Sequence, residues 1–247
     1  MKNLLVLILL ASMPLFLFAQ KEGTIVFTET IQLQIDLPEE AKQYAMHLPK
    51  EQKSLNALYF NANESLYKTY EGAEDETIEH EEGDGMMRMV IKRPDYRIYK
   101  NLGNSEKLVK QEFFGRNFLI KESPDKMNWK ITAEQKKILD YTCMKAVYQD
   151  TSKTVEAWFT PQIAVSNGPG SYDQLPGMIL EVNVDNGKRT IVAKSVELKT
   201  LEKDAIKKPK KGKKVSREEF EEISEKKMKE MEAEMGGNGS FQIKIRN

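Results

Sequence analysis

The chain has 247 residues, which is enough for one sizeable domain with appendages. Its 38 lysines and arginines balance 38 aspartates and glutamates, so no excess charge attracts nucleic acid or an anionic membrane. Cys143 is the only cysteine, so no intramolecular disulfide can form and stability must come from packing.

The start of the chain has the pattern of an export signal. A positive start and an apolar run precede Ala19, the small residue that suits signal-peptidase cleavage. Pro14 and an apolar length below the roughly 20 residues of a membrane span argue against a retained transmembrane helix. We therefore expect residues 1–19 to be a signal peptide. The mature chain should be periplasmic or secreted, without a transmembrane helix and without a lipid anchor, because no cysteine follows the apolar run.

Strand patterns dominate the next part of the chain. Residues 21–35 alternate apolar and polar side chains, as expected for a strand with one buried face. Residues 39–46 predict a short helix with acids in its first turn. A hairpin of two strands is expected in residues 54–70, and a Glu-rich exposed loop in residues 71–85.

His80 lies between Glu79 and Glu81 in the expected loop. Imidazole and carboxylate groups are both metal ligands. Adjacent residues on a loop seldom converge on one ion, however, because metal-site spacing places ligands on one face or across a turn. We therefore expect no metal site here, and no cofactor elsewhere in the chain.

Short strands with turn residues between them continue from residue 86: 86–92, 96–100, 108–114, 117–122, 138–147 and 154–159. A polar turn or single helical turn is expected at residues 133–137. No helix long enough for a parallel crossover separates these strands. The chain thus predicts a mainly β fold, a single curved antiparallel sheet or open half-barrel with short helices and a C-terminal helical extension.

Two Gly-containing dipeptides predict turns. Pro176-Gly177 fits the central positions of a type II turn, where glycine accepts a positive φ. Asn186-Gly187 favours a hairpin that would pair Val182 with Ile191 on one face. The glycines at 168 and 170 predict a structural loop, since no helix follows them to form a phosphate cradle.

Several motifs follow one another in a fixed order: Trp-Lys-Ile-Thr at 129–132, Tyr-Thr-Cys-Met-Lys-Ala at 141–146, Ala-Trp-Phe-Thr at 157–160, Gly-Pro-Gly at 168–170 and Leu-Pro-Gly-Met-Ile-Leu-Glu at 175–181. In this order they resemble the GLPGLI family of exported bacterial envelope proteins, named for a Gly-Leu-Pro-Gly-Leu-Ile element. Gln174 and Met178 depart from that element, where it has its first Gly and its Leu. The resemblance covers roughly residues 24 to 200, and it implies location and fold rather than an activity.

Aromatic residues near these motifs are candidates for a ligand pocket. Trp158, Phe159 and Tyr172 could line such a pocket, or could fill the core. The turn residues Leu175, Pro176 and Gly177 belong to the same candidate region.

Three other side chains invite a catalytic interpretation. Cys143 could be a nucleophile, but a thiol needs a nearby base, and the two histidines lie outside any motif. A buried, inert thiol is therefore favoured. Glu156 and Glu181 could form a carboxylate pair for hydrolysis, or could lie on the wet face of their strands.

The composition changes after residue 201. A basic linker at 207–214 precedes Ser216 and Glu219, which have the spacing of a helix capping box. An amphipathic helix follows, and residues 241–246 alternate like a last strand. We expect a signal peptide (1–19), an antiparallel β domain (20–201) and an extension of linker, helix and terminal strand (202–247).

These features favour an exported, non-catalytic protein that binds a lipid, another apolar ligand or a further envelope protein. One alternative is a hydrolase or transferase that uses Cys143, or Glu156 with Glu181. Another is a structural interaction module acting through the C-terminal helix. No nucleic-acid partner is expected, and the sequence leaves the oligomeric state open.

Overall fold

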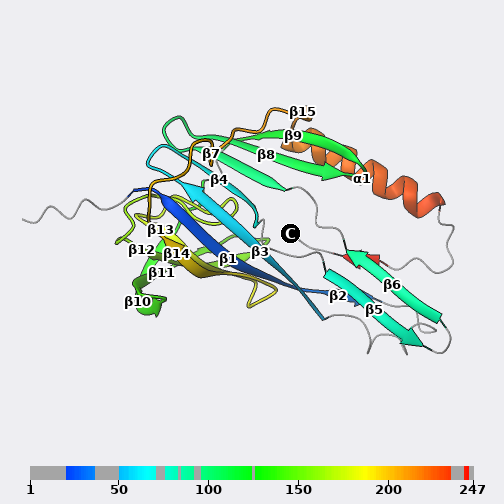
Figure 1. Ribbon diagram of the computed structural model, residues 1–247, viewed down its shortest axis with the longest axis horizontal. Helices are drawn as coiled ribbons and strands as arrows, with labels where there is room; N and C mark the ends of the chain where they lie inside the picture. Colours follow the sequence, from blue (N-terminus) through cyan, green and yellow to red (C-terminus); the bar gives the residue numbers. More distant parts are fainter. Residues whose placement is uncertain are drawn as a thin grey trace, which may run out of the picture.

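Figure 1 shows the computed structural model of the chain. The structure describes residues 21–36, 50–70, 76–82, 85–91, 96–123, 126–234 and 242–244. The expected signal peptide and the expected helix at 39–46 lie outside these described residues. Within them, no helix is long and apolar enough to cross a membrane.

Sixteen strands and one helix are described. In chain order they are β1 (Gly23–Gln32), β2 (Gln34–Asp36), β3 (Glu51–Phe60), β4 (Glu64–Thr69), β5 (Glu76–Glu82), β6 (Gly85–Ile91), β7 (Arg97–Asn101), β8 (Glu106–Phe113), β9 (Arg116–Glu122), β10 (Lys130–Ile138), β11 (Tyr141–Gln149), β12 (Thr154–Thr160), β13 (Met178–Val184), β14 (Arg189–Glu197), β15 (Lys213–Ser216), α1 (Arg217–Glu234) and β16 (Gln242–Lys244).

Twelve of these strands form one open sheet, in the order β10-β11-β12-β13-β14-β1-β3-β4-β7-β8-β9-β15. All neighbours are antiparallel except β15, which runs parallel to β9. The predicted fold class is confirmed: the protein is mainly β, its large sheet is curved and open, and the single described helix is C-terminal.

Two local predictions are wrong. Part of the expected loop at 71–85 is strand β5, which pairs with β6 so that His80 faces Met87 in the register. The expected turn at 133–137 lies inside β10, which pairs with β11 across an irregularity between Ile131 and Gln135. Both segments are polar, so their composition predicted a loop or a turn. Each forms a strand because its backbone pairs with a neighbouring strand, which composition alone does not show. Lysines also suit β10 because it is an edge strand of the sheet.

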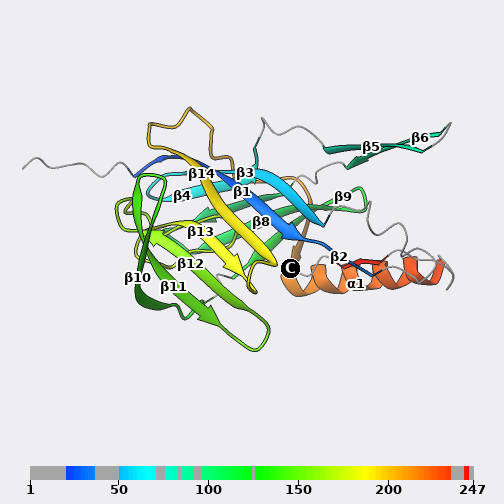
Figure 2. The same cartoon turned by 90° about the horizontal axis from the view of Figure 1, so that it is seen from below.

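The sheet curves so far that its two halves face each other (Figure 2). The segment between β12 and β13 demonstrates this, because Lys100 on β7 reaches the carbonyl oxygens of Gly168 and Tyr172 at 3.3 Å. β7 lies far from β12 and β13 in the strand order. The segment at 161–177 therefore crosses the inner, concave face of the sheet.

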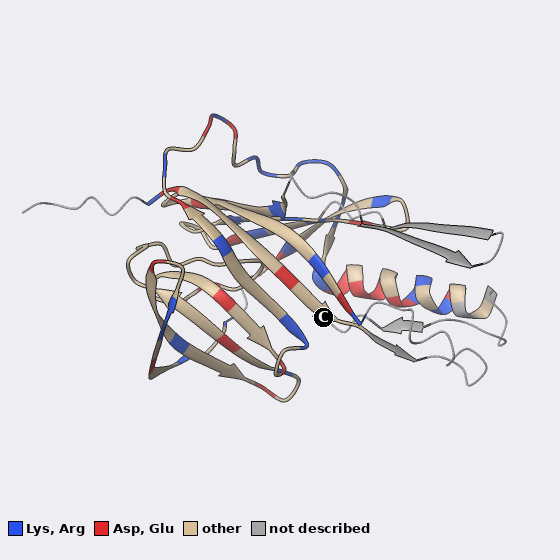
Figure 3. Cartoon of the chain, turned by 60° about the horizontal axis from the view of Figure 1, so that its bottom comes forward, with Lys and Arg blue, Asp and Glu red and all other residues tan. Residues whose placement is uncertain are grey.

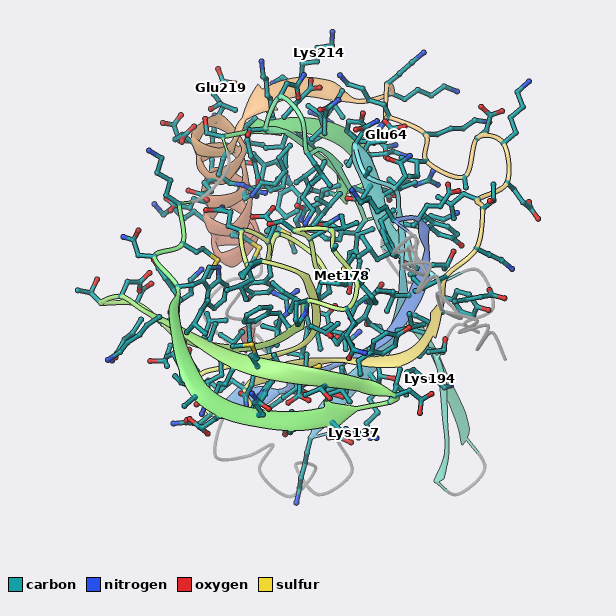
Figure 4. All side chains as sticks on the ribbon, turned by 90° about the vertical axis from the view of Figure 1, so that its left-hand side faces the viewer. Glu64, Lys137, Met178, Lys194, Lys214 and Glu219 are labelled. Carbon is teal, nitrogen blue, oxygen red and sulfur yellow. The ribbon has the colours of Figure 1, made fainter. Side chains whose placement is uncertain are left out.

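Side chains fill the space that the sheet encloses, as the end-on view shows around Met178 (Figure 4). Met178 is fully buried, as are Ile25 and Phe27 of β1 and Leu175 of the crossing segment. Figure 4 also shows Lys137 and Lys194 on the outside of the same sheet, and both are exposed. Alternation along each strand thus separates an apolar inner face from a wet outer one.

The Asn186-Gly187 hairpin has the predicted register, with Val182 opposite Ile191. The Pro176-Gly177 turn does not have the predicted type. The φ of Gly177 is 150°, whereas a type II turn needs about 80°. Glycine is required because a Cβ there would lie 2.2 Å from the carbonyl oxygen of Thr160.

The C-terminal part continues the sheet and then leaves it. β15 adds to the β9 edge, and the predicted capping box begins α1: the Ser216 amide donates to the Glu219 carboxylate (2.8 Å), and the Glu219 amide to the Ser216 hydroxyl (3.1 Å). Phe220 then packs edge-on against Phe118, with ring centroids 5.2 Å apart. Only the first part of the helix touches the sheet, and the rest projects past it (Figure 1). The proposed domain boundary at 201/202 stays a prediction.

Candidate functional site

A buried ion pair lies on the inner face of the sheet, between Glu29 of β1 and Arg189 of β14. Nε of Arg189 is 2.8 Å from Oε1 of Glu29. The alternation of β1 places Glu29 on the same face as the core residues Ile25 and Phe27. The Glu29 side chain is 10% exposed and the Arg189 side chain 27%, so the pair opens toward solvent only on the arginine side.

The second carboxylate oxygen of Glu29 is also occupied. Oε2 accepts a hydrogen bond from Nδ2 of Asn56 at 3.0 Å and a longer one from the hydroxyl of Tyr67 at 3.4 Å. Asn56 lies on β3 and Tyr67 on β4. Together with Arg189 on β14, side chains of three strands near β1 therefore hold the Glu29 carboxylate. A buried charge this well paired costs little, whereas the same charge without its partners would be strongly destabilising.

Three tyrosine hydroxyls interact electrostatically with Arg189: those of Tyr67 on β4, Tyr96 just before β7, and Tyr172 on the crossing segment. Burial raises the pKa of all three, for Tyr96 to about 12, and Arg189 partly offsets the rise. Each hydroxyl therefore stays protonated at neutral pH and remains a hydrogen-bond donor. We refer to Glu29, Tyr67, Tyr96, Tyr172 and Arg189 as the Arg189 site.

Arg189 itself stays charged in this setting. Burial disfavours the guanidinium, but Glu29 first and then the tyrosines outweigh this, and the pKa of Arg189 is raised above its usual value. A charged guanidinium can donate hydrogen bonds to hydroxyl or carboxylate oxygens in a fixed plane. The Arg189 site thus combines a partly exposed guanidinium with protonated phenol groups.

The structure separates the aromatic residues that the sequence grouped together. Phe159 and Leu175 are about 1% exposed and belong to the core. Pro176 is exposed and Gly177 forms the close approach to β12. Of the predicted pocket residues, only Tyr172 reaches the Arg189 site.

Trp158 lies on the opposite, outer face of the sheet. Nζ of Lys136 is 4.3 Å from the centre of its ring, and the same ammonium contacts both carboxylate oxygens of Glu181 at 2.7 Å. Lys145 pairs with Glu156 at 3.0 Å. We refer to Trp158, Lys136, Lys145, Glu156 and Glu181 as the outer cluster.

Glu156 and Glu181 both belong to the outer cluster, where each pairs with a different lysine. Their suggested role as a catalytic carboxylate pair stays a prediction. Cys143 is fully buried, and burial raises the pKa of its thiol to about 11. A thiol with such a pKa is almost wholly protonated at neutral pH and is a poor nucleophile.

Sequence reasoning missed four residues of the Arg189 site: Glu29, Tyr67, Tyr96 and Arg189. One signal was present: Glu29 continues the apolar phase of Ile25 and Phe27, so an acid occupies a core-facing position of β1. A charge in that phase implies a buried partner. The identity of that partner was not accessible, because Arg189 follows 160 residues later.

Among the residues that the structure describes, no group of three or more histidine, cysteine, aspartate or glutamate side chains could hold a metal ion. His80 belongs to β5 rather than to a loop, and its metal interpretation stays untested.

Charges are otherwise spread over the molecule. Figure 3 shows acidic and basic positions interleaved along both halves of the sheet and along α1.

Residues 100–222 match the model of a domain family described as "N-glycanase peptide, N-terminal domain". The matched part runs from β7 to the first turns of α1. No curated protein matches the chain.

Two solved structures of PNGF-II have a similar fold. The structure in space group P21 has a TM-score of 0.55 and 18% identity, covering 82% of this chain and 33% of that one. The structure in space group C2 has a TM-score of 0.52 and 19% identity, covering 81% and 32%. At this identity the likeness shows a shared fold, and the chain spans about a third of the length of PNGF-II.

These comparisons correct the sequence interpretation. The resemblance to the GLPGLI family is wrong, because the matching family model is that of an N-glycanase N-terminal domain and the similar structures are of PNGF-II. The expected function, a non-catalytic binder of a lipid, apolar ligand or envelope partner, is overturned by the same findings. Short strand and turn motifs misled the assignment because Gly/Pro turns and alternating strands recur in many β folds. By both comparisons, the chain is similar to the N-terminal domain of N-glycanases and to PNGF-II.

Proposed function

We propose that this chain takes part in releasing N-linked glycans from polypeptides, and that the Arg189 site engages the glycopeptide. The family match over residues 100–222 supports the reaction class, and the fold likeness to PNGF-II is consistent with it. The site is supported above all by one observation: the charged Arg189 on the concave face is held by Glu29 and interacts electrostatically with three tyrosine hydroxyls.

The chemistry of the site suits a glycan. A pyranose presents hydroxyls at its edge and C–H groups on its face, so it pairs with hydrogen-bond donors and with aromatic surfaces. Arg189 supplies several donors in a fixed plane, and Tyr96 and Tyr172 supply both rings and hydroxyls. Glu29 accepts bonds from its neighbours on both oxygens, so its part is to orient Arg189 rather than to move a proton.

Hydrolysis needs more than orientation. A guanidinium can stabilise the negative charge that develops on an oxygen during bond cleavage. A group that activates water must have a lone pair for the proton that it takes, and the Glu29 carboxylate already accepts three hydrogen bonds, from Arg189, Asn56 and Tyr67. We therefore assign substrate engagement and charge stabilisation to the Arg189 site.

Binding of a matched set of ligands tests the proposal. An N-glycosylated peptide, the same peptide without its glycan and the free glycan would be titrated calorimetrically into the protein. We expect the glycopeptide to bind most tightly, and Arg189→Gln to weaken its binding at least tenfold, since a charged hydrogen bond contributes about 1.5–3 kcal/mol. Lys136→Met, which changes the outer cluster, is the control and should leave the affinity unchanged.

A release assay completes the test. The glycopeptide would be incubated with the protein, and mass spectrometry would detect free glycan and the mass of the remaining peptide, which identifies the bond that is cut. Equal binding of glycosylated and bare peptide, together with no release, would overturn the proposal.

Export is a second part of the proposal. The Lys2 to Ala19 pattern would deliver the chain to the periplasm or the medium, where glycoproteins from outside the cell are accessible. Mass measurement of the mature N-terminus, expected near Gln20, would test it.

A further inference from the structure

We infer that Lys100 is a positioning residue of the Arg189 site, because it holds the segment 168–173, and with it the backbone of Tyr172, across the inner face. The inference deepens the proposed function. Of its two tests, only the measurement of glycopeptide affinity depends on that function. Lys100 makes no contact with the glutamate or the arginine in the described interactions, so it acts through the segment that it holds.

The side chain of Lys100 is directed at the segment from another part of the sheet. Its ammonium lies 3.3 Å from the carbonyl oxygen of Gly168, 3.3 Å from that of Tyr172 and 3.5 Å from Oδ2 of Asp173. Three acceptors of one short segment thus converge on one cation. Lys100 is only 3% exposed, so these contacts exchange little with water.

A buried ammonium is a costly way to fill space. Burial lowers the pKa of Lys100 to about 8, the neighbouring Lys107 adds to the effect, and Asp173 opposes it. An apolar side chain would avoid this cost, so the interactions with the segment are the feature that the lysine adds. The charged groups facing Lys100 are Asp173 on the segment and Lys107 on β8.

The two ends of the segment are fixed by other contacts. Asn167 bridges to Met178 of β13, and its side chain accepts a bond from the Gly168 amide at 2.8 Å. At the far end, the indole of Trp129 donates to the Asp173 carbonyl at 2.9 Å. Between them, two hydrogen bonds hold the backbone of Tyr172. Its carbonyl oxygen accepts one from Lys100, and its amide donates one to the carbonyl oxygen of Pro169.

Tyr172 is the one side chain of this segment that belongs to the Arg189 site. It is 9% exposed, and Arg189 and Glu29 both act on its hydroxyl. β7 therefore shapes the site twice: Tyr96, just before it, contributes directly, and Lys100 contributes by placing Tyr172. A loosened segment would keep the ion pair of Glu29 and Arg189 but would no longer hold Tyr172 in place.

Hydrogen exchange of the whole protein tests the positioning role. Lys100→Met keeps the length of the side chain and removes its charge and its donors. We expect the amides of Gly168 and Tyr172 to exchange about tenfold faster or more in this variant, relative to the amides of β1 and β3. The reason is that the ammonium no longer holds the carbonyl oxygens of these residues, so the segment opens more often. Glycopeptide affinity should fall by about fivefold or more.

Two further variants keep the test decisive. Ile98→Ala on the same strand removes a core side chain that is 1% exposed, and controls for general destabilisation. It should lower stability without a selective rise in exchange at 168–173. Trp129→Phe deletes the indole donor to Asp173, together with part of the ring that packs against Tyr148. It should loosen the segment in the same direction even if Lys100→Met does not fold.

The outcomes separate this inference from the proposed function. Unchanged exchange at Gly168 and Tyr172 in both segment variants would overturn the positioning role. Faster exchange with unchanged glycopeptide affinity would overturn it as well, since the segment would then not shape the site. If the wild type binds no glycopeptide but the segment loosens selectively, the proposed function fails and the role of Lys100 in fixing Tyr172 stands.

Discussion

The two faces of the sheet carry clusters of similar composition and different physical character. Both clusters combine aromatic side chains with an ion pair. In the Arg189 site the pair joins β1 and β14, and in the outer cluster Lys136 of β10 pairs with Glu181 of β13. On the inner face the side chain of Glu29 is 10% exposed and accepts hydrogen bonds from Arg189, Asn56 and Tyr67. On the outer face the side chain of Lys136 is 36% exposed, so water and salt screen its pairing with Glu181.

The difference in solvent exposure between the two ion pairs indicates which of them can hold its neighbours in a fixed arrangement. An ion pair in water contributes little and specifies little, whereas a desolvated pair must be satisfied by chosen neighbours and then holds them in one arrangement. Trp158, the most conspicuous aromatic of the sequence, lies in the screened cluster, and the less conspicuous Tyr172 lies in the desolvated one.

Removing the cation of the inner pair should have the largest effect. Arg189→Met leaves Glu29 buried without its counter-ion, so we expect a loss of about 3–5 kcal/mol in the free energy of unfolding. Urea unfolding followed by circular dichroism measures it. Adding Glu29→Gln should recover part of the loss, and a cost below about 1 kcal/mol for Arg189→Met alone would remove the contrast between the faces.

The reactivity of Cys143 tests how far solvent reaches the part of the sheet beneath the outer cluster. Burial raises the thiol pKa from 9.0 to about 11, which lowers the thiolate fraction about a hundredfold. Labelling with a thiol reagent at pH 8 should therefore be at least about a hundredfold slower in the folded protein than in denaturant. Labelling at comparable rates would show that Cys143 is open to solvent.

Lys100 predicts a pH dependence of stability with a definite sign. Its pKa is about 8 in the folded protein against 10.5 in the unfolded chain. Between these values the unfolded chain binds the proton that the folded protein has released, so this group makes stability rise with pH. Below pH 8 both states are protonated and the full cost of burial is present.

The expected gain is about 2 kcal/mol between pH 8 and pH 9.5, measured as the difference between wild type and Lys100→Met by urea unfolding at each pH. The range stops short of pH 10, where the tyrosines begin to titrate. A difference that stays flat or falls across the range would contradict the burial of a charged Lys100.

The smallest effect is expected on the outer face. Lys136→Met removes the ion pair with Glu181 and the contact with Trp158, and we expect a loss below about 1 kcal/mol in the free energy of unfolding. The loss should also shrink in high salt, whereas that of Arg189→Met should change little. A larger loss, insensitive to salt, would show that the two clusters are equivalent.

The amino-acid sequence by itself determined the local architecture. Alternation in β1, the hairpin at Asn186-Gly187 and the capping box of Ser216 and Glu219 depend on neighbouring residues, so each could be predicted. The mainly β class and the open curved sheet followed from many such short patterns. Local patterns recur across unrelated β proteins, however, and for that reason they pointed to the wrong family.

Only the tertiary structure decided the site. Glu29 and Arg189 are 160 residues apart, and Lys100 and Tyr172 are 72 apart. Their meeting depends on the order of the strands and on how far the sheet curves, which no local pattern encodes. Strand β10 shows the same limit, since pairing with β11 overrode its polar composition. The sequence thus determined which side chains face inward, and the curvature of the sheet decided which of them meet.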